Sequence, residues 1–378
     1  MTEPIRILQV MGTLNRGGTE TMLMNIYRNI DRSKVQFDFI IHTNEKCDYN
    51  DEIVKLGGKI FNIVNYNGKN HFLYKNAWNT FFSTHPEYKI IHAHKRSTAS
   101  IYLKVAKKYG IVTIAHSHST ASRGTKIEQI SKNIIQFPIR YVADYLFACS
   151  NEAGKWLFGK NVIKKDNYKV IKNAIDIEKY TFNLTKRNEM RKALGVEGKF
   201  VVGHVGTFTY PKNHKLLINI FYEIQKQKQN SVLLLVGDGE LRQRIEKQIN
   251  DLRIKDKVIL TGVVENVNEY IQAMDVFVFP SIFEGLGMAA IEAQAAGIRC
   301  IVSDKLPNEV FITDLVESVS LNLDKKYWGE IILKYNNDYI KENMFNALKL
   351  NGYDVKSVAN NLKDFYIKIY NNREKKKY

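Results

Sequence analysis

The sequence predicts an α/β protein made of two doubly wound domains, each with a mostly parallel sheet. Its 378 residues exceed the roughly 100–200 residues of one ordinary domain. A content of 44% hydrophobic and 25% charged residues is that of a globular protein and excludes disordered, collagen-like and coiled-coil classes. Short β-branched or aromatic runs alternate with amphipathic stretches of helical length along both halves, which is typical of βαβ units.

The first half alternates predicted strands with stretches of helical periodicity. Glu20–Ile30 is a predicted helix that begins at Thr19, and Thr98–Tyr109 is a second helix, which Gly110 ends. The predicted strands are Ile5–Val10, Phe37–His42, Lys59–Ile63, Ile90–Ala93, Val112–His116, Tyr145–Cys149 and Tyr168–Ile171.

The domain boundary is predicted after the last of these strands, because residues 181–199 are polar and charged without strand periodicity. We predict domains over 1–175 and 176–354, and a final segment, 355–378, whose helix Val355–Tyr370 packs back on the first domain. The second domain has predicted helices from about Asn213, from about Glu240 and over Met288–Ala296, and strands Phe200–His204, Val232–Val236, Val258–Leu260, Val276–Phe279 and Cys300–Val302.

The net charge of +17 is concentrated in the first half, where the residues up to Lys172 include 26 basic and 13 acidic side chains. Such an excess suits an anionic membrane surface, a polyanion or an acidic substrate, and a lysine-rich proteome explains it equally well. The three scattered cysteines predict neither a disulfide framework nor a zinc site. No apolar run approaches the ~20 residues of a membrane span, so we expect a cytoplasmic protein, at most associated with the inner face of the membrane.

Ligands of parallel sheets bind beyond the carboxyl ends of the strands, and in the first half two segments there stand out. Gly17 and Gly18 precede a helix, where free N–H groups favour an anion. His116 and His118 end the fifth strand and alternate onto one side, and His92 and His94 end the fourth. These imidazoles favour hydrogen bonds to a hydroxylated or phosphorylated ligand; capping of loops is the alternative. A metal is less favoured, because no acidic third ligand lies nearby.

In the second half, Lys212 follows a strand and a glycine turn at the start of a helix, a position suited to a diphosphate. The sharpest segment is 279–293, in which a buried strand ends at Pro280 and a glycine-bearing loop leads into an alanine-rich helix. Glu284 lies in that loop, and Glu292 lies in the second helical turn with its side chain leaning toward the helix start. A carboxylate there can accept two hydrogen bonds from a ribose diol.

These residues resemble the family-4 retaining glycosyltransferases of the GT-B fold, in particular the branch that makes bacterial capsules and exopolysaccharides. The resemblance covers nearly the whole chain and implies two Rossmann-like domains that face each other across a cleft, with a C-terminal helix crossing back to the first. It rests on Gly17-Gly18-Thr19-Glu20, HSH at 116–118, HVGTFTYPKNH at 204–214, the run from Thr261 to Asp275, and above all Glu284 to Glu292 within PSIFEGLGMAAIEAQAAG.

The resemblance also implies roles for single residues. Glu292 would hold the donor ribose, Glu284 the donor sugar, and Lys212 the diphosphate, while His118, with His116 as second choice, would lie beside the donor sugar and the acceptor. The first domain would bind the acceptor and the second the nucleotide sugar. The implied catalytic residues are His118, Glu284 and Lys212, and the implied donor-binding residues are Gly17, Gly18, Thr207, Lys212, Val264, Glu284, Gly285, Leu286, Gly287, Met288 and Glu292.

The implied activity is transfer of a hexose from a nucleotide diphosphate sugar, preferably a UDP-sugar, to a glycan or lipid pyrophosphate-linked acceptor, with retention and without a cofactor or obligatory metal. Two positions depart from the family: Thr207 replaces an arginine that pairs with the lysine, and Ala174 replaces a glycine of the linker. The alternatives are a nucleotide-sugar epimerase or hydrolase and a non-catalytic donor-binding partner. A polyanion-binding module is the least favoured, and nucleic acid is not expected, because the basic residues are not interleaved with aromatics.

Overall fold

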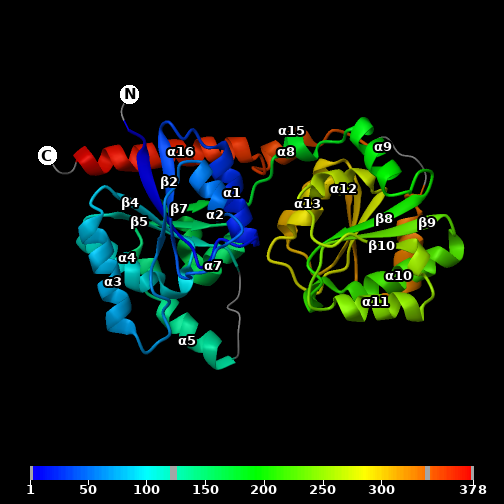
Figure 1. The fold of residues 1–378 in the computed structure, drawn as a ribbon, viewed down its shortest axis with the longest axis horizontal. Helices are drawn as coiled ribbons and strands as arrows, with labels where there is room; N and C mark the ends of the chain where they lie inside the picture. The colour runs from blue at the N-terminus through cyan, green and yellow to red at the C-terminus, as the bar shows by residue number, and fades with distance from the viewer. Residues whose placement is uncertain (1–2, 120–125, 337–340, 376–378) are drawn as a thin grey trace. The chain divides into compact units, whose positions relative to one another are not determined.

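The computed structural model describes residues 3–119, 126–336 and 341–375, and it divides the chain into two compact units (Figure 1). The first unit is Met1–Ile175 together with Gly352–Tyr378, and the second is Asp176–Asn351. Each unit has one parallel sheet with helices on both faces, which confirms the predicted fold class. Across the described ranges, no helix is both long and apolar enough to cross a membrane.

The first unit has a parallel sheet in the order β3-β2-β1-β4-β5-β6-β7. Neighbouring residues of a strand enter different cores: Ile7 packs in the core under α1 and α16, and Leu8 in the core under α3 and α4. The elements are β1 (Ile5–Val10), α1 (Gly18–Asn29), β2 (Val35–Ile41), α2 (Asn50–Lys55), β3 (Ile60–Asn62), α3 (His71–Thr84), β4 (Ile90–Ala93), α4 (Ala99–Lys108), β5 (Val112–Ser117), α5 (Lys126–Gln136), α6 (Ile139–Val142), β6 (Tyr145–Ala148), α7 (Asn151–Phe158), β7 (Tyr168–Val170) and α16 (Val355–Lys375).

The second unit repeats this plan with the strand order β10-β9-β8-β11-β12-β13. Val202 packs under α10 and α14, and its neighbour Val201 packs on the face that carries α13. The elements are α8 (Ile177–Tyr180), α9 (Leu184–Ala193), β8 (Phe200–Val205), α10 (His214–Gln227), β9 (Ser231–Val236), α11 (Arg242–Asp251), β10 (Val258–Leu260), α12 (Val267–Ala273), β11 (Val276–Phe279), α13 (Met288–Ala295), β12 (Arg299–Ser303), β13 (Val316–Val319), α14 (Lys325–Leu333) and α15 (Phe345–Leu350).

Helix α16 packs on the first unit, as the sequence predicts. The Phe365 ring lies 5.0 Å from that of Tyr145 and 5.1 Å from that of Phe147, both on β6. The helix runs to Lys375, beyond the predicted end at Tyr370, because Arg373 donates a hydrogen bond of 2.7 Å to the carbonyl of Gly110 at the end of α4. The last helix of the chain therefore completes the core of the first unit.

One local expectation was wrong, and two elements were not predicted. Helix α1 begins at Gly18 with the extended Gly17 as its N-cap, so Thr19 lies inside the helix. Residues 181–199 contain the helix α9. This helix has no apolar stripe in its sequence, because the residues that face inward are arginines with ionic partners. The edge strand β13 was missed, because its sequence, VESV, carries a glutamate and alternates little.

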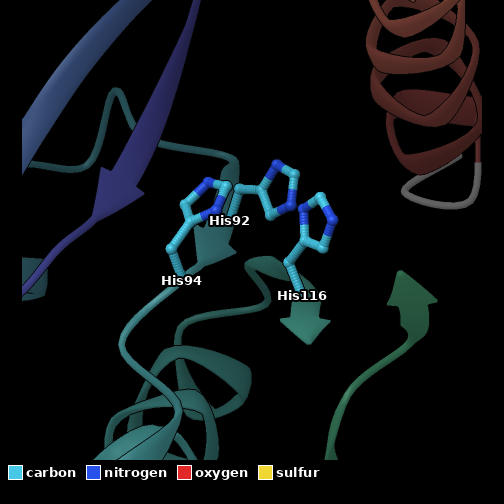
Figure 2. Close-up of side chains that lie close together, drawn as sticks. All are labelled: His92, His94 and His116. Carbon is cyan, nitrogen blue, oxygen red and sulfur yellow. The ribbon is translucent and has the colours of Figure 1, made fainter. Parts of the chain in front are cut away.

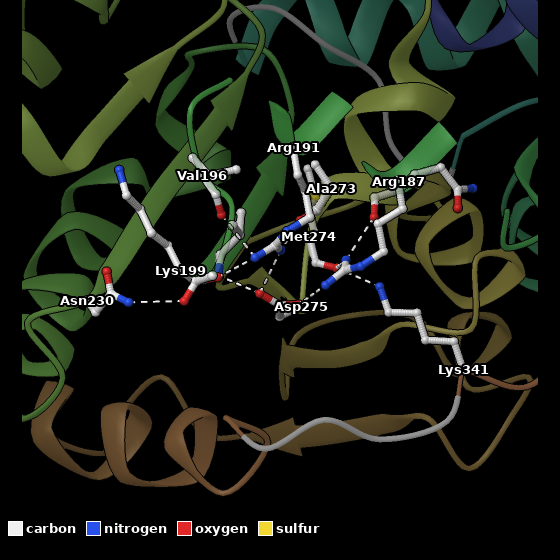
Figure 3. Close-up of polar contacts among 12 residues, drawn as sticks. Arg187, Arg191, Val196, Lys199, Asn230, Ala273, Met274, Asp275 and Lys341 are labelled. Carbon is white, nitrogen blue, oxygen red and sulfur yellow. Dashed lines mark hydrogen bonds and ion pairs between the residues drawn. The ribbon is translucent and has the colours of Figure 1, made fainter. Parts of the chain in front are cut away.

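A buried ionic cluster fastens α9 to the sheet (Figure 3). Asp275, just before β11, pairs with Arg187 and lies 3.1 Å from Arg191, and it accepts a hydrogen bond of 2.7 Å from the amide of Val201. Lys341 donates a hydrogen bond of 2.7 Å to the carbonyl of Met274, and burial together with Arg187 lowers the pKa of Lys341 to about 7. One carboxylate thus balances two largely buried arginines.

We predict that Asp275→Ala destabilises the protein by about 3 kcal/mol, because it leaves two largely buried guanidinium groups without their carboxylate. Thermal or denaturant unfolding of the full chain measures this loss. The matched control is Glu246→Ala, which removes the partner of Arg242 in an exposed ion pair and should leave the midpoint unchanged. Equal midpoints for the two variants would contradict the assigned role of Asp275.

Candidate functional site

Two loops at the carboxyl ends of β8 and β11 are joined by hydrogen bonds. The amide of Ile282 donates to the carbonyl of Pro211 over 2.8 Å, and the side-chain amide of Asn213 donates to the carbonyl of Pro280 over 3.1 Å. Asn213 has a left-handed φ of 55°, which turns the chain into α10 directly after Lys212. The two segments that sequence analysis singled out in this unit are therefore held side by side.

Lys212 and Glu284 form an ion pair across these loops. The ammonium nitrogen lies 2.7 Å from Glu284 Oε1, but the geometry of this contact is not that of a hydrogen bond. The side chain of Lys212 is 21% exposed and that of Glu284 is 10% exposed. The same ammonium lies 4.7 Å from the centroid of the Phe279 ring. Because water is largely displaced, the attraction between the ammonium and the carboxylate is stronger than it would be in bulk water.

Glu292 lies on α13 and is largely withdrawn from solvent. Its carboxyl is hydrogen-bonded to Tyr180 of α8, and Lys179 and Lys212 contribute positive potential. Burial outweighs these contacts and raises the pKa of Glu292 to about 7, while burial and the same carboxylate raise the pKa of Tyr180 well above its ordinary value. A carboxyl group with a pKa near 7 is only partly ionised at neutral pH, which is typical of a ligand-binding position.

The loop that leads into α13 has accessible main-chain atoms. Gly285 is exposed, and a side chain there would meet no atom within 4 Å. Gly287 has a left-handed φ of 74° and is the N-cap of α13, whose first residue is Met288. Leu286 is buried and anchors the loop. Free N–H groups at such a helix start suit an anion or a sugar oxygen.

Glycines also line the carboxyl ends of β8, β9 and β10. The amide of Gly237 donates a hydrogen bond of 3.0 Å to the carbonyl of Gly262, and Gly237 has a φ of 138°. A side chain at Gly206 would come within 3.3 Å of the Lys212 stem, so glycine there leaves room for the lysine. Thr207 is exposed, Val263 is 75% exposed, and Val264 is partly buried.

In the first unit, Gly17 caps α1 in an extended conformation, with φ −137° and ψ 167°. No atom lies within 4 Å of the place where a side chain of Gly18 would begin, whereas the Glu20 carboxylate lies against Gly17. The N-terminus of α1 is therefore open on the side of Gly18 and covered by a carboxylate on the side of Gly17.

Four histidines crowd the carboxyl ends of β4 and β5, as their alternation predicts (Figure 2 shows three of them). The rings of His116 and His118 lie 4.0 Å apart, and those of His92 and His94 lie 4.3 Å apart. Burial lowers the pKa of all four, that of His94 to about 3, and neighbouring imidazoles lower the pKa of the other three further. These side chains are therefore neutral near pH 7.

His92, His94 and His116 each place a ring nitrogen within 4.8 Å of the others, a spacing at which imidazoles can bind a metal ion. Two features disfavour this use. Both nitrogens of His94 are hydrogen-bonded, to Gln9 and to His118. The rings of His92 and His116 are stacked, 5.3 Å apart and inclined by 10°, whereas ligands direct their lone pairs at one centre. The arrangement suits hydrogen bonding better than metal ligation.

The structure thus gathers Lys212, Glu284 and Glu292 in the second unit, and it places Gly17, Gly18, His116 and His118 in the first. Sequence reasoning missed Tyr180, the partner of Glu292, and Gln9 and Tyr366, which contact the histidines. No motif marks these three residues, because each is remote in sequence from the side chain it contacts.

Comparison with known proteins gives matches in both units. Residues 16–179 match the family model Glycosyltransferase Family 4, and residues 186–347 match Glycosyl transferases group 1. The putative glycosyltransferase EpsF of Bacillus subtilis (strain 168) is 31% identical over 373 residues, 96% of each chain. An Escherichia coli enzyme named UDP-Gal:alpha-D-GlcNAc-diphosphoundecaprenol alpha-1,3-galactosyltransferase is 26% identical over 300 residues, 76% of this chain and 77% of that enzyme.

A solved structure shows the same architecture along nearly the whole chain. Anabaena Alr3699/HepE in complex with UDP and glucose aligns with a TM-score of 0.77 at 17% identity, covering 96% of this chain and 99% of that one. The shared architecture is the GT-B fold, which confirms the fold that the sequence motifs imply.

We predict that Glu292→Gln changes the pH dependence of stability. The pKa of Glu292 is raised from 4.5 to about 7, so the native state favours the protonated carboxyl. The contribution of this carboxyl to the stability of the native state is therefore lost as pH rises from about 4.5 to 7. Glutamine cannot ionise, so the variant should gain on the order of 1–3 kcal/mol relative to the wild type between pH 5 and pH 8.

Melting curves of both proteins at pH 5, 6, 7 and 8 measure this difference. Glu246→Gln, an exposed glutamate, is the matched control and should follow the wild type at every pH. If the difference between Glu292→Gln and the wild type did not change with pH, Glu292 would not be the buried carboxyl described above.

Proposed function

Since this chain belongs to the family-4 glycosyltransferases, we propose that it transfers a hexose from a UDP-sugar to a hydroxyl of a lipid-linked glycan, with retention of configuration, in the assembly of a surface polysaccharide. The grouping of Lys212, Glu284 and Glu292 carries this proposal. The names of the E. coli relative and of the complex with UDP and glucose support a UDP-sugar.

Each member of the group has a distinct task in this proposal. The carboxylate of Glu292 accepts hydrogen bonds from the ribose diol, and Tyr180 holds it in place. Lys212 stabilises the diphosphate. To do so, its ammonium must leave Glu284 and contact a phosphate oxygen instead. Glu284, thereby released, faces the hydroxyls of the donor sugar, while the amides of the 285–288 loop contact the sugar and the phosphates.

The proposed reaction breaks the bond between the anomeric carbon and the diphosphate oxygen. The acceptor oxygen bonds to the same face of that carbon, and its proton passes to the departing phosphate oxygen. Lys212 and the helix N-termini stabilise the negative charge that develops on the phosphate. We assign no nucleophile, cofactor or obligatory metal to this reaction, because these charges and the departing phosphate provide for each step.

We also propose that the first unit contacts an anionic membrane, where a lipid-linked acceptor would lie. Helix α5 has a surface suited to this contact. Ile130 and Ile134 lie one turn apart and are 61% and 68% exposed, and the exposed rings of Phe137 and Tyr141 follow at 5.9 Å from each other. Between Lys95 and Tyr141 the sequence has nine basic residues and one acidic residue. Exposed apolar side chains within a basic stretch fit the interface of an anionic bilayer.

We predict that Lys212→Ala mainly impairs catalysis, whereas Glu292→Gln mainly impairs the binding of UDP. Lys212→Ala should lower the turnover number by about 10²–10³, since it removes a charge aimed at the leaving group. Glu292→Gln should mainly weaken UDP binding, by about tenfold. UDP-dependent shifts of the melting temperature, followed by UDP release from UDP-hexoses with and without lipid extract, measure both, and the exposed Lys247→Ala is the control.

The same measurements test the activity itself. UDP release that depends on the lipid extract supports transfer, release without acceptor indicates a hydrolase or epimerase, and binding of UDP without release indicates a non-catalytic partner. If neither variant differed from Lys247→Ala, the assigned site would be wrong.

We predict that Ile130→Ser/Ile134→Ser lowers binding to phosphatidylglycerol-containing vesicles at least tenfold, because burial of each isoleucine contributes about 1.5–3 kcal/mol. Co-sedimentation of the full chain with vesicles measures this loss, and vesicles of phosphatidylcholine alone should bind weakly. Leu184→Ser/Leu350→Ser removes two exposed leucines of the second unit and should not weaken binding. Equal losses in both double variants would contradict a docking role for α5.

A further inference from the structure

The histidine cluster ends a row of hydrogen-bonded side chains that begins on α16. Tyr366 of α16 lies 2.7 Å from His92 Nδ1 and 3.4 Å from the side-chain amide of Gln9. Gln9 Oε1 lies 2.9 Å from His94 Nε2, and His94 Nδ1 lies 2.8 Å from His118 Nε2. These contacts, all within the first unit, link the last helix of the chain to the histidine that the family motif singles out.

The row has a direction, because each neutral imidazole has one N–H and one lone pair. The Gln9 carbonyl oxygen can only accept, so His94 donates from Nε2 and keeps a lone pair at Nδ1. His118 must then donate from Nε2 to that lone pair, which leaves its own lone pair at Nδ1. In the part of the chain that the structure describes, His118 Nδ1 has no hydrogen-bond partner.

At the other end of the row, the Gln9 side chain turns its amide nitrogen toward Tyr366 and its carbonyl oxygen toward His94. The tyrosine oxygen accepts from the Gln9 amide over 3.4 Å, and it lies 2.7 Å from His92 Nδ1, where either atom can be the donor. This arrangement keeps the Gln9 carbonyl turned toward His94. Without the tyrosine hydroxyl, the amide could rotate by half a turn and reverse every bond between Gln9 and His118.

Burial keeps the row neutral. Tyr366 and Gln9 are fully buried, and burial lowers the pKa of His94 to about 3 and that of His118 well below its ordinary value, with His116, His94 and Arg96 contributing further. A proton added at any one histidine would break the sequence of donors and acceptors. The tautomer of His118 is therefore set by its neighbours over the physiological pH range.

We propose that Gln9, His94 and Tyr366 are positioning residues that hold His118 as the neutral Nε2–H tautomer, so that its Nδ1 lone pair accepts a hydrogen bond from a hydroxyl of the acceptor. In this form His118 cannot donate from Nδ1 to a phosphate oxygen. The tautomer is a property of the folded chain, and only its use in hydroxyl recognition rests on the proposed function.

The test is long-range proton–nitrogen NMR of the full chain labelled with ¹⁵N-histidine, in which the two ring nitrogens of each tautomer have distinct shifts. His118→Gln assigns the His118 signals. We expect one neutral Nε2–H form in the wild type between pH 6 and pH 8. Tyr366→Phe should convert this to a mixture of tautomers, while Tyr27→Phe, which removes another buried hydroxyl of the same unit, should leave it unchanged.

A wild-type His118 protonated at Nδ1 would overturn the proposal, as would a Tyr366→Phe spectrum identical to the wild type. If Tyr366→Phe does not fold, His94→Ala replaces it, since this variant frees His118 Nε2 directly and must give mixed tautomers. In transfer assays, Tyr366→Phe should lower the turnover number severalfold at an unchanged donor KM. Failure of transfer with the expected NMR result would refute the proposed function and leave the tautomer assignment standing.

Discussion

In a parallel sheet covered by helices on both faces, polar side chains gather mainly at the ends of the strands. Both units obey this constraint: strand interiors such as Val201 and Val202 enter apolar cores, and the functional candidates stand where the strands end. Because these ends are also largely dry, a polar group there is strongly stabilised by a partner. The pairing of Lys212 with Glu284 and of His94 with His118 provides such partners.

The two units provide these partners by different means. The second unit balances opposite charges, with Lys212 against Glu284, and it keeps the carboxyl of Glu292 near its point of ionisation. The first unit keeps its imidazoles neutral and joins His94 to His118 as acceptor and donor. Charged groups suit a diphosphate and neutral ones suit hydroxyls, so the division agrees with a nucleotide-sugar donor and a hydroxyl acceptor.

Strand β11 connects stability with the site in the second unit. Asp275 precedes this strand and holds the arginines of α9, and Pro280 to Glu284 follow it and carry the loop that faces Lys212. Helix α16 has a similar double role in the first unit, because Phe365 packs on β6 while Tyr366 contacts His92 and Gln9. In both units the residues that fasten the fold adjoin those proposed to act in it.

The sequence by itself determined the α/β class, most strands, the motif from Glu284 to Glu292 and the common side of His116 and His118, because periodicity and short motifs are local. It misplaced the start of α1 and missed α9, whose inward arginines are stabilised by Asp275, more than eighty residues away. Only the tertiary structure decided that Lys212 pairs with Glu284, that Tyr180 holds Glu292 and that Tyr366 reaches the histidines. These contacts join residues that no local pattern relates, and they exist only because the packed sheets bring the ends of distant segments together.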